Sequence, residues 1–256
     1  DNGFLGDARI TDLLFDKRDR LWIAYSTGLV VLEGNNWSTL SGNLPSYVVN
    51  ALEEDKDGNI WIGTYEGLVK YDGVNFQVFN KSNSPLTDNN IQALTLLKNG
   101  SIAMGTARGG IFIKNNNNWV HHNIAEDLAE DKIANNVIDI IEYNNVLWAY
   151  ILGDTFEGTR SSYIKYVNGV WEKYSLPLQF AVEPVSFYVD LSNNLWIAGK
   201  TGLVKINSAN QAKLFNTQDY SFYGNYHCTS AVVDNSGDVY TTTLGGGLVK
   251  INKGNY

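Results

Sequence analysis

Acidic residues recur along the 256-residue chain, each six positions before a tryptophan or the residue that replaces it. Paired carboxylates can act as acid and base, and the Asp-Lys-Asp-Gly-Asn segment at 55–59 carries hard oxygen ligands that suit calcium. The column supplies a single carboxylate in each of five of the six repeats, however, and the 55–59 segment lacks the distal acidic ligand of a 12-residue calcium loop. Because Asp and Asn before Gly are common in turns, we predict a structural role and no metal site. The column comprises Asp16, Asp55, Leu97, Glu142, Asp190 and Asp234, with Tyr143 as an alternative to Glu142 in the fourth repeat.

Other groups that could do chemistry are few. The chain has three histidines, His121, His122 and His227, and the adjacent pair would point to opposite faces of a strand. Cys228 is the single cysteine, which excludes an internal disulfide and a multi-cysteine metal site. The sequence contains no Gly-x-Ser-x-Gly elbow and no phosphate-binding loop. We therefore expect a protein without catalytic residues or a cofactor.

The carboxylates belong to a repeated β-hairpin. Residues 55–72 read DKDGNIWIGTYEGLVKYD, in which two short runs of strand-forming residues alternate with turn residues. The tryptophan positions of successive copies are 39, 42, 45, 48 and 44 residues apart, a period typical of four-stranded propeller blades. The other copies span 16–34, 97–115, 142–150 (followed by an insertion before 163–166), 190–207 and 234–252.

Two further strands complete each repeat. An apolar innermost strand precedes the hairpin and is predicted at 10–15, 48–52, 91–97, 137–141, 185–189 and 229–233. An outer strand follows it and is predicted at 37–40, 76–79, 119–122, 171–174 and 212–215. This spacing predicts an all-β protein, a β-propeller of six four-stranded antiparallel blades with an incomplete last blade, or alternatively part of a seven-bladed ring. No Pro- or Ser-rich linker interrupts the repeats, so we expect residues 1–256 to form one domain.

Composition narrows the classes of partner and location. A net charge of -8 argues against binding to nucleic-acid backbones. No run of 18 apolar residues is present, so we expect no membrane span. The scarcity of cysteine and the abundance of Asn, Gly, Trp and Tyr suit an exported bacterial β protein. We therefore expect an extracytoplasmic protein, in the periplasm or at the cell surface. Because Asp1 opens within a repeat, we expect that a signal sequence has been removed.

The motif Asp-x-x-Gly-Asn-Ile-Trp-Ile-Gly-Thr-x-x-Gly-Leu-x-Lys-Tyr at 55–71 resembles the two-component regulator propeller repeat. The second and fifth copies match it through Leu21-Trp22-Ile23 and Leu195-Trp196-Ile197. The resemblance implies a propeller of the kind found in periplasmic sensor regions of Bacteroidetes-type hybrid histidine kinases and in related exported propellers, some tied to secretion and surface assembly. The motif residues form turns and pack between blades, so the resemblance specifies the fold rather than a ligand. No kinase, receiver or DNA-binding segment is recognisable in the sequence, so signalling is not assigned to the chain itself.

Variable loops indicate where a ligand would bind. The turns between the first and second and between the third and fourth strands of each repeat are short and uniform, whereas the other connections vary, and binding usually resides in variable loops on a rigid scaffold. The variable set includes the insertion at 153–160, the acidic segment at 121–136, predicted to form one or two helical turns with Leu128 and Ile133 inward, and the aromatic segment at 220–227. Positions just after the second strands are predicted to converge, which gives the candidate ligand-binding residues Tyr25, Tyr65, Glu66, Arg108 and Lys200. The insertion adds Asp154, Phe156 and Arg160, and the aromatic segment adds Tyr223 and His227.

These observations favour a non-catalytic, extracytoplasmic propeller that binds a glycan, peptide or protein. One alternative is a propeller enzyme, a lyase or hydrolase acting on a glycan or peptide. Another is a structural component of a surface or secretion assembly, in which a partner chain or a missing segment completes the last blade. That second alternative predicts an exposed apolar patch beside Leu248 and Ile251.

Overall fold

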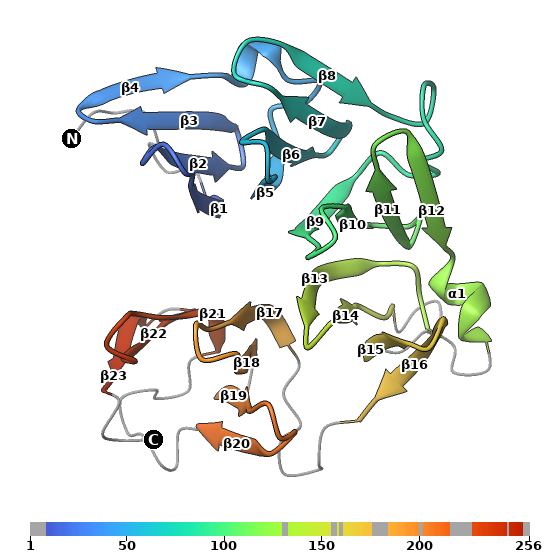
Figure 1. Cartoon of the computed structure of the whole chain (residues 1–256), viewed down its shortest axis with the longest axis vertical. Helices are drawn as coiled ribbons and strands as arrows, with labels where there is room; N and C mark the ends of the chain where they lie inside the picture. Colours follow the sequence, from blue (N-terminus) through green and yellow to red (C-terminus); the bar gives the residue numbers. More distant parts are fainter. Residues whose placement is uncertain are drawn as a thin grey trace. The chain divides into compact units, whose positions relative to one another are not determined.

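The structure, a computed structural model, describes residues 9–129, 133–154, 158, 161–175, 184–199, 202–215, 227–244 and 246–252. These residues form six antiparallel sheets of consecutive strands and one short helix, α1 (Ile124–Asp127) (Figure 1). The predicted all-β, six-bladed propeller is therefore confirmed. The chain divides into two compact units, residues 1–140 with 151–160 and residues 141–150 with 161–256, which we describe separately.

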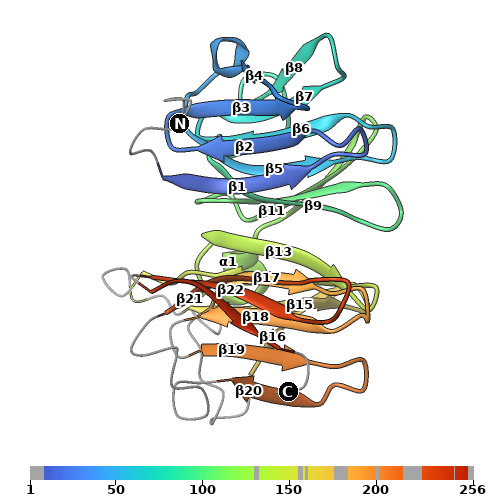
Figure 2. The same cartoon turned by 90° about the vertical axis from the view of Figure 1, so that its left-hand side faces the viewer.

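The first unit contains three complete blades. Strands within each blade follow chain order, and Figure 2 shows β1, β2 and β3 side by side in the first. A 3-10 turn at Ser41–Asn43 follows the first blade. Blade 1 comprises β1 (Ile10–Phe15), β2 (Leu21–Tyr25), β3 (Gly28–Glu33) and β4 (Asn36–Thr39); blade 2 comprises β5 (Val49–Glu54), β6 (Ile60–Thr64), β7 (Gly67–Tyr71) and β8 (Phe76–Phe79); blade 3 comprises β9 (Ile91–Leu96), β10 (Ile102–Thr106), β11 (Ile111–Asn115) and β12 (Asn118–His122).

The remaining sheets have the same order. The sixth has three strands among the described residues. Blade 4 comprises β13 (Val137–Tyr143), β14 (Val146–Ile151), β15 (Ser162–Val167) and β16 (Val170–Tyr174); blade 5 comprises β17 (Pro184–Val189), β18 (Leu195–Gly199), β19 (Gly202–Ile206) and β20 (Ala212–Phe215); blade 6 comprises β21 (Cys228–Val233), β22 (Val239–Thr243) and β23 (Gly247–Ile251).

Tryptophan side chains pack between consecutive blades of the first unit. Trp22 of blade 1 is fully buried in a cluster with Leu52, Ile62 and Val69 of blade 2. Trp61 of blade 2 lies in the equivalent cluster against blade 3, which includes Ile91, Ile102, Met104 and Phe112. The strongest sequence signal therefore marks residues that hold neighbouring blades together.

A glycine in the repeat allows the next blade to approach closely. An added Cβ at Gly63 would lie 2.9 Å from Cγ2 of Ile91, the first residue of β9. At the equivalent position in blade 3, a Cβ on Gly105 would lie 2.5 Å from Cγ1 of Val137. Real Cβ atoms do not come this close to other atoms, so the glycine in the Trp-Ile-Gly-Thr sequence is explained by packing.

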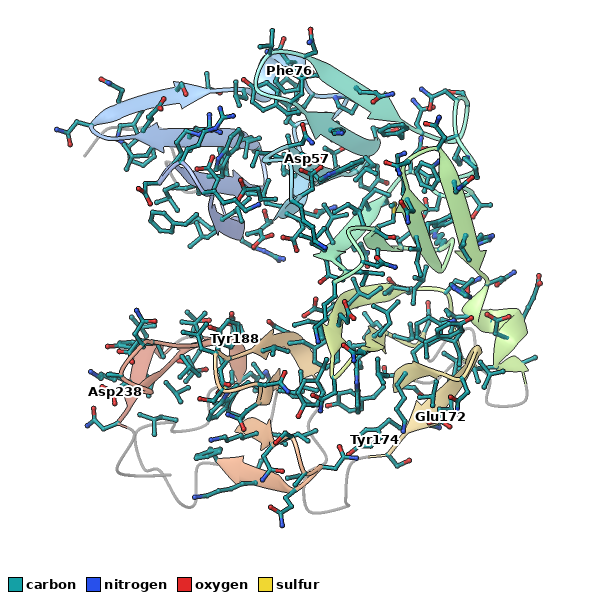
Figure 3. All side chains as sticks on the ribbon, viewed as in Figure 1. Asp57, Phe76, Glu172, Tyr174, Tyr188 and Asp238 are labelled. Carbon is teal, nitrogen blue, oxygen red and sulfur yellow. The ribbon has the colours of Figure 1, made fainter. Side chains whose placement is uncertain are left out.

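Polar contacts supplement this packing in the second unit (Figure 3). Glu172, labelled there, forms an ion pair with Lys165 at 2.8 Å across β15 and β16. The hydroxyl of Tyr188 on β17 donates a hydrogen bond to the backbone oxygen of Val233 on β21 at 3.4 Å, which connects the fifth and sixth blades. Trp196 is fully buried beside Phe215 and Cys228.

The segment after β12 contains the predicted helical turn. Helix α1 spans Ile124–Asp127, and Ile133 is buried as predicted, whereas Leu128 is only partly buried. The fully buried residue of the helix is Ile124, which the sequence analysis did not single out. Among the described residues, no helix has the length and apolar character needed to cross a membrane.

Candidate functional site

The recurring carboxylates hold turns. In the three copies with Asp before Trp, a carboxylate oxygen accepts a hydrogen bond from the indole Nε1 at 2.8–2.9 Å, which pairs Asp16 with Trp22, Asp55 with Trp61 and Asp190 with Trp196. Burial opposes ionisation of Asp55, but hydrogen bonds from Asn59, Trp61 and the turn backbone outweigh it and lower the pKa of that carboxyl. No group of three or more metal-ligating side chains occurs within the described part of the chain. The column thus has the structural role that its turn chemistry predicted.

An open cleft of about 280 Å³ lies where loops of blades 2 and 3 meet. The loop between β6 and β7 contributes Tyr65 and Glu66, and the loop between β10 and β11 contributes Ala107 and Arg108. We call this the blade 2–3 cleft, and its remaining lining residues, Lys81, Asp88, Asn89 and Asn90, come from the connection between β8 and β9.

The connection at 80–90 is anchored in the core and exposes its polar side to the cleft. Leu86 is buried in the cluster that contains Trp61. The backbone N–H of Lys81 donates to Asn89 Oδ1 at 2.9 Å, and Asn89 Nδ2 donates to Glu66 Oε2 at 3.4 Å. The connection is therefore bonded both to itself and to the blade 2 hairpin.

Asp88 fixes the blade 3 side of the cleft. Its Oδ2 accepts the backbone N–H of Arg108 at 2.7 Å, and its Oδ1 accepts that of Asn90 at 3.3 Å. The backbone N–H of Ala107 in turn donates to the backbone oxygen of Asn90 at 3.0 Å. The backbone that carries Arg108 is thus held at consecutive residues.

Two glycines keep the Arg108 loop close to its neighbours. A Cβ on Gly109 would lie 2.7 Å from Thr87 Oγ1 and 2.9 Å from Thr106 Oγ1. Gly110 has a φ of +81°, and a Cβ there would lie 2.3 Å from the backbone oxygen of His122. Larger residues would displace the loop, so these glycines set its position. His121 adds a contact, because its Nε2 lies 2.7 Å from the backbone oxygen of Gly109 while its ring stacks on Phe112.

The structure brings three predicted site residues, Tyr65, Glu66 and Arg108, to the blade 2–3 cleft. All three are exposed, with 53% of the Tyr65 surface accessible. Their role as ligand-binding residues stays a prediction. Five lining residues were missed. Ala107 has no functional group that would mark it, and the other four belong to the 80–90 connection, which has no counterpart of similar sequence in the other repeats. Its run of short polar side chains, KSNSPLTDNN, was the available signal.

Tyr25 does not occupy the position predicted for it. It is the last residue of β2 and is 8% exposed, packed with Ile23 and Val30. It pairs with Gly28 as Thr64 pairs with Gly67, so it is equivalent to Thr64 rather than to Tyr65. The expectation of an exposed ring there was wrong, because alternation along β2 turns this side chain into the core.

Two of the remaining candidates, Asp154 and His227, are described, and neither is among the residues that line the cleft. Asp154 is exposed in the first unit, and His227, in the second, is partly buried just before β21, where its backbone oxygen accepts a hydrogen bond from Leu244 at 2.8 Å. Phe156, Arg160, Lys200 and Tyr223 lie outside the described residues, as does most of the predicted aromatic segment at 220–227.

The apolar surface predicted for blade 6 is present only in part. Leu248 on β23 is 67% exposed, whereas its counterparts Leu68 and Leu203 are fully buried. Ile251, predicted to lie beside it on the surface, is 1% exposed and packs in the core of the second unit. That half of the prediction was wrong.

Solved structures with the same fold come from several functional classes. PorZ, a surface component of the type-IX secretion system of Porphyromonas gingivalis, matches at a TM-score of 0.74 and 15% identity over 98% of this chain and 41% of its own. The extracellular domain of the putative one component system BT4673 from B. thetaiotaomicron matches at 0.74 and 18% over 97% of this chain and 35% of its own. A catalytically inactive virginiamycin B lyase from Staphylococcus aureus, solved with quinupristin, matches at 0.78 and 12% over 98% and 83%.

The sequence identities to all three structures are low, so the comparison shows a shared fold alone. The chain spans less than half the length of the first two structures. No curated protein matches the sequence. The family model of the two component regulator propeller does match, over residues 43–66, which include β5, β6 and the loop with Tyr65 and Glu66. The predicted resemblance is confirmed: this six-bladed propeller carries a two component regulator propeller repeat.

Proposed function

We propose that this chain is a non-catalytic binding propeller that uses the variable-loop side of blades 2 and 3, at the blade 2–3 cleft, to hold its ligand. The observation that carries the proposal is the construction of this cleft. Residues from three connections line it, and hydrogen bonds and close glycine contacts fix their backbones. A rigid polar concavity with an exposed aromatic ring has the features of a recognition site.

The contrast with the opposite set of turns supports this assignment. The first-to-second and third-to-fourth strand turns use their polar side chains internally: Asp72, for example, accepts the backbone N–H groups of Val74 and Asn75 at 2.8 and 2.7 Å. In the cleft, by contrast, the side chains of Tyr65 and Arg108 extend from braced backbones and remain exposed. Binding is therefore assigned to the side where the repeat varies.

Proteins of similar fold support an extracytoplasmic location. BT4673 was solved as an extracellular domain, and PorZ is described as a surface component. The composition of the chain suits the same environment, so we place it outside the cytoplasm, as a sensor-type or surface-associated binding module. An enzymatic role is the alternative, because lyases share the fold.

A thermal-shift screen tests the proposal. The purified chain is screened against oligosaccharide fragments and short peptides, because a ligand that binds the folded state raises the melting temperature by mass action. The test variant is Tyr65→Ala with Arg108→Ala. The matched control is Val74→Ala with Arg18→Ala, which removes an apolar and a cationic side chain, both exposed, from the turns of the opposite set.

We expect a ligand-dependent rise in melting temperature for the wild type and the control, and none for the cleft variant. A rise retained by the cleft variant would contradict the assignment of the site. Turnover of the same ligand, detected by mass spectrometry of the incubated mixture, would replace the binding function with an enzymatic one.

A further inference from the structure

Resting on the proposed function, we infer that the ligand of the blade 2–3 cleft carries a carboxylate, which the Arg108 guanidinium binds with support from Lys81. The carbon skeleton next to the carboxylate packs on the ring of Tyr65. The inference comes from which hydrogen-bonding groups in the cleft are already used and which are not.

The acceptors of the cleft are largely satisfied within the protein. Both carboxylate oxygens of Asp88 accept backbone N–H groups. Asn89 Oδ1 accepts the backbone N–H of Lys81, and Asn90 Oδ1 accepts Asn50 Nδ2 at 3.1 Å. Glu66 uses one oxygen to accept from Asn89. Among the described lining residues, the side-chain acceptors that make no hydrogen bond are the second oxygen of Glu66 and the Tyr65 hydroxyl.

By contrast, three donor groups of the cleft make no hydrogen bond within the described residues. Within the described part of the chain, neither the Arg108 guanidinium nor the Lys81 ammonium makes a hydrogen bond or ion pair, and the Asn90 side-chain amide donates none. A guanidinium has five N–H donors and an ammonium has three. The cleft therefore has a surplus of donors, and a complementary ligand must bring acceptor oxygens.

A carboxylate fits this surplus better than a neutral group. The guanidinium fork matches the two oxygens of a carboxylate and can bind both at once. A carboxamide offers a single acceptor oxygen and adds donors, for which the cleft has few free acceptors. The negative charges of Glu66 and Asp88 offset the positive charges of Lys81 and Arg108, so the long-range attraction of the cleft for an anion is small. The preference for a carboxylate over a carboxamide must therefore come from the direct contact with the guanidinium.

The position of Arg108 is set before any ligand arrives. Its backbone N–H is bound to Asp88, and Gly109 and Gly110 hold the following residues against Thr87 and His122. A preorganised backbone reduces the ordering cost of binding. On the blade 2 side, the backbone N–H of Tyr65 donates to Val48 at 3.1 Å, which holds the residue whose exposed ring provides the apolar surface.

Matched pairs of carboxylate and carboxamide test the inference: glucuronate with glucuronamide, and hippurate with hippuramide. The two pairs also separate a sugar acid from an acylated amino acid as the source of the carboxylate. Dissociation constants are measured by NMR titration of the full chain. We expect one or both carboxylates to bind at least about tenfold more tightly than their amides, as a charged hydrogen bond typically provides.

Variants locate the contact. Arg108→Gln should abolish the tenfold preference, and Lys81→Gln should reduce it by a smaller factor. Arg18→Gln, which removes the same charge from an exposed turn of the opposite set, should leave it unchanged. The melting temperature of each variant is measured to show that it is folded.

Three results would overturn the inference: equal binding of acid and amide, an unchanged preference in Arg108→Gln, or no binding by any of the four probes. These results are distinguishable from failure of the proposed function. A neutral ligand found in the screen and lost in the Tyr65 and Arg108 variant would leave the binding function standing without the carboxylate.

Discussion

The two sides of blade 2 use similar residues for opposite purposes. In the turn between β5 and β6, Asp55 is buried and accepts hydrogen bonds from Asn59 and Trp61, so its charge is used within the hairpin. At the opposite end of β6, in the loop that leads to β7, Tyr65 and Glu66 are exposed in the blade 2–3 cleft. The repeated residue stabilises the fold, whereas the variable positions are where we propose that the ligand binds.

The largest expected effect comes from the repeat. Trp61→Ala removes a ring that is 5% exposed and packed between blades 2 and 3, so we expect a loss of roughly 3–5 kcal/mol in the free energy of unfolding. Tyr65→Ala, four residues along the same hairpin, should cost less than about 0.5 kcal/mol because its ring is exposed. Chemical denaturation measures both, and a loss below about 1 kcal/mol for Trp61→Ala would contradict the packing.

Asp55→Ala tests the turn itself. The substitution leaves the indole N–H of Trp61 and the turn N–H groups without their acceptor, so we expect a loss of about 2 kcal/mol. Asp57→Ala is the matched control, because Asp57 is exposed in the same turn (Figure 3). Equal effects of the two substitutions in denaturation experiments would show that the buried hydrogen bonds add nothing.

Two carboxylates on the innermost strands, Asp12 and Glu53, lower the stability of the folded protein as the pH rises, which is the opposite of the effect of Asp55. Asp12 Oδ2 accepts the backbone N–H of Leu52 at 2.7 Å, and Glu53 Oε2 accepts that of Leu96 at 3.1 Å, so each reaches the next blade. Burial raises the pKa of Asp12 to about 6 and that of Glu53 to about 7. In the folded protein they ionise only at a cost, which is largest above pH 7 and fades as the pH falls toward the ordinary carboxyl range near 4.

We therefore expect the free energy of unfolding to rise as the pH is lowered from 8 toward about 4.5. Below that range it falls, because Asp16, Asp55 and Asp190, whose pKa values are lowered, lose their hydrogen-bonded charge. Asp12→Asn keeps an acceptor for Leu52 and should stabilise the protein by roughly 1–2 kcal/mol at pH 8. Denaturation at pH 8 and 4.5 should show this gain shrinking to less than half; a constant difference would exclude titration as its cause.

The smallest expected effect on stability belongs to the cleft. Arg108→Ala should change the free energy of unfolding by less than about 0.5 kcal/mol, since its exposed side chain makes no hydrogen bond within the described residues. The same variant should lose ligand binding. A stability loss comparable to that of Asp55→Ala would show that Arg108 belongs to the scaffold.

The fold could be predicted from sequence because every element is repeated. The outer strands Phe76–Phe79 and Ala212–Phe215 have the predicted bounds, and the innermost strands differ by at most two residues at either end. The packing of Trp22 and Trp61 between blades follows from the same repeat. Whether residues 1–256 form a single domain stays a prediction.

The site was less predictable, for physical reasons. The sequence placed Tyr65, Glu66 and Arg108 at converging hairpin ends, but the lining residues Asp88 and Asn90 come from a connection without a repeated counterpart. Tyr25 was misplaced by one position, which moves it from the exposed loop to the end of β2, a strand that is buried on both faces. The raised pKa values of Asp12 and Glu53 come from burial, which outweighs the hydrogen bonds from Leu52 and Leu96, and alternation within one strand cannot reveal that burial.

Ligand binding at the blade 2–3 cleft is best tested by the ligand-induced rise in melting temperature. This rise is compared among the wild type, the Tyr65→Ala and Arg108→Ala variant, and the Val74→Ala and Arg18→Ala control. We expect the rise to be lost in the cleft variant and retained in the control. If the rise were lost in the control and retained in the cleft variant, the ligand would bind at the uniform turns, and the assignment of binding to the cleft would be wrong.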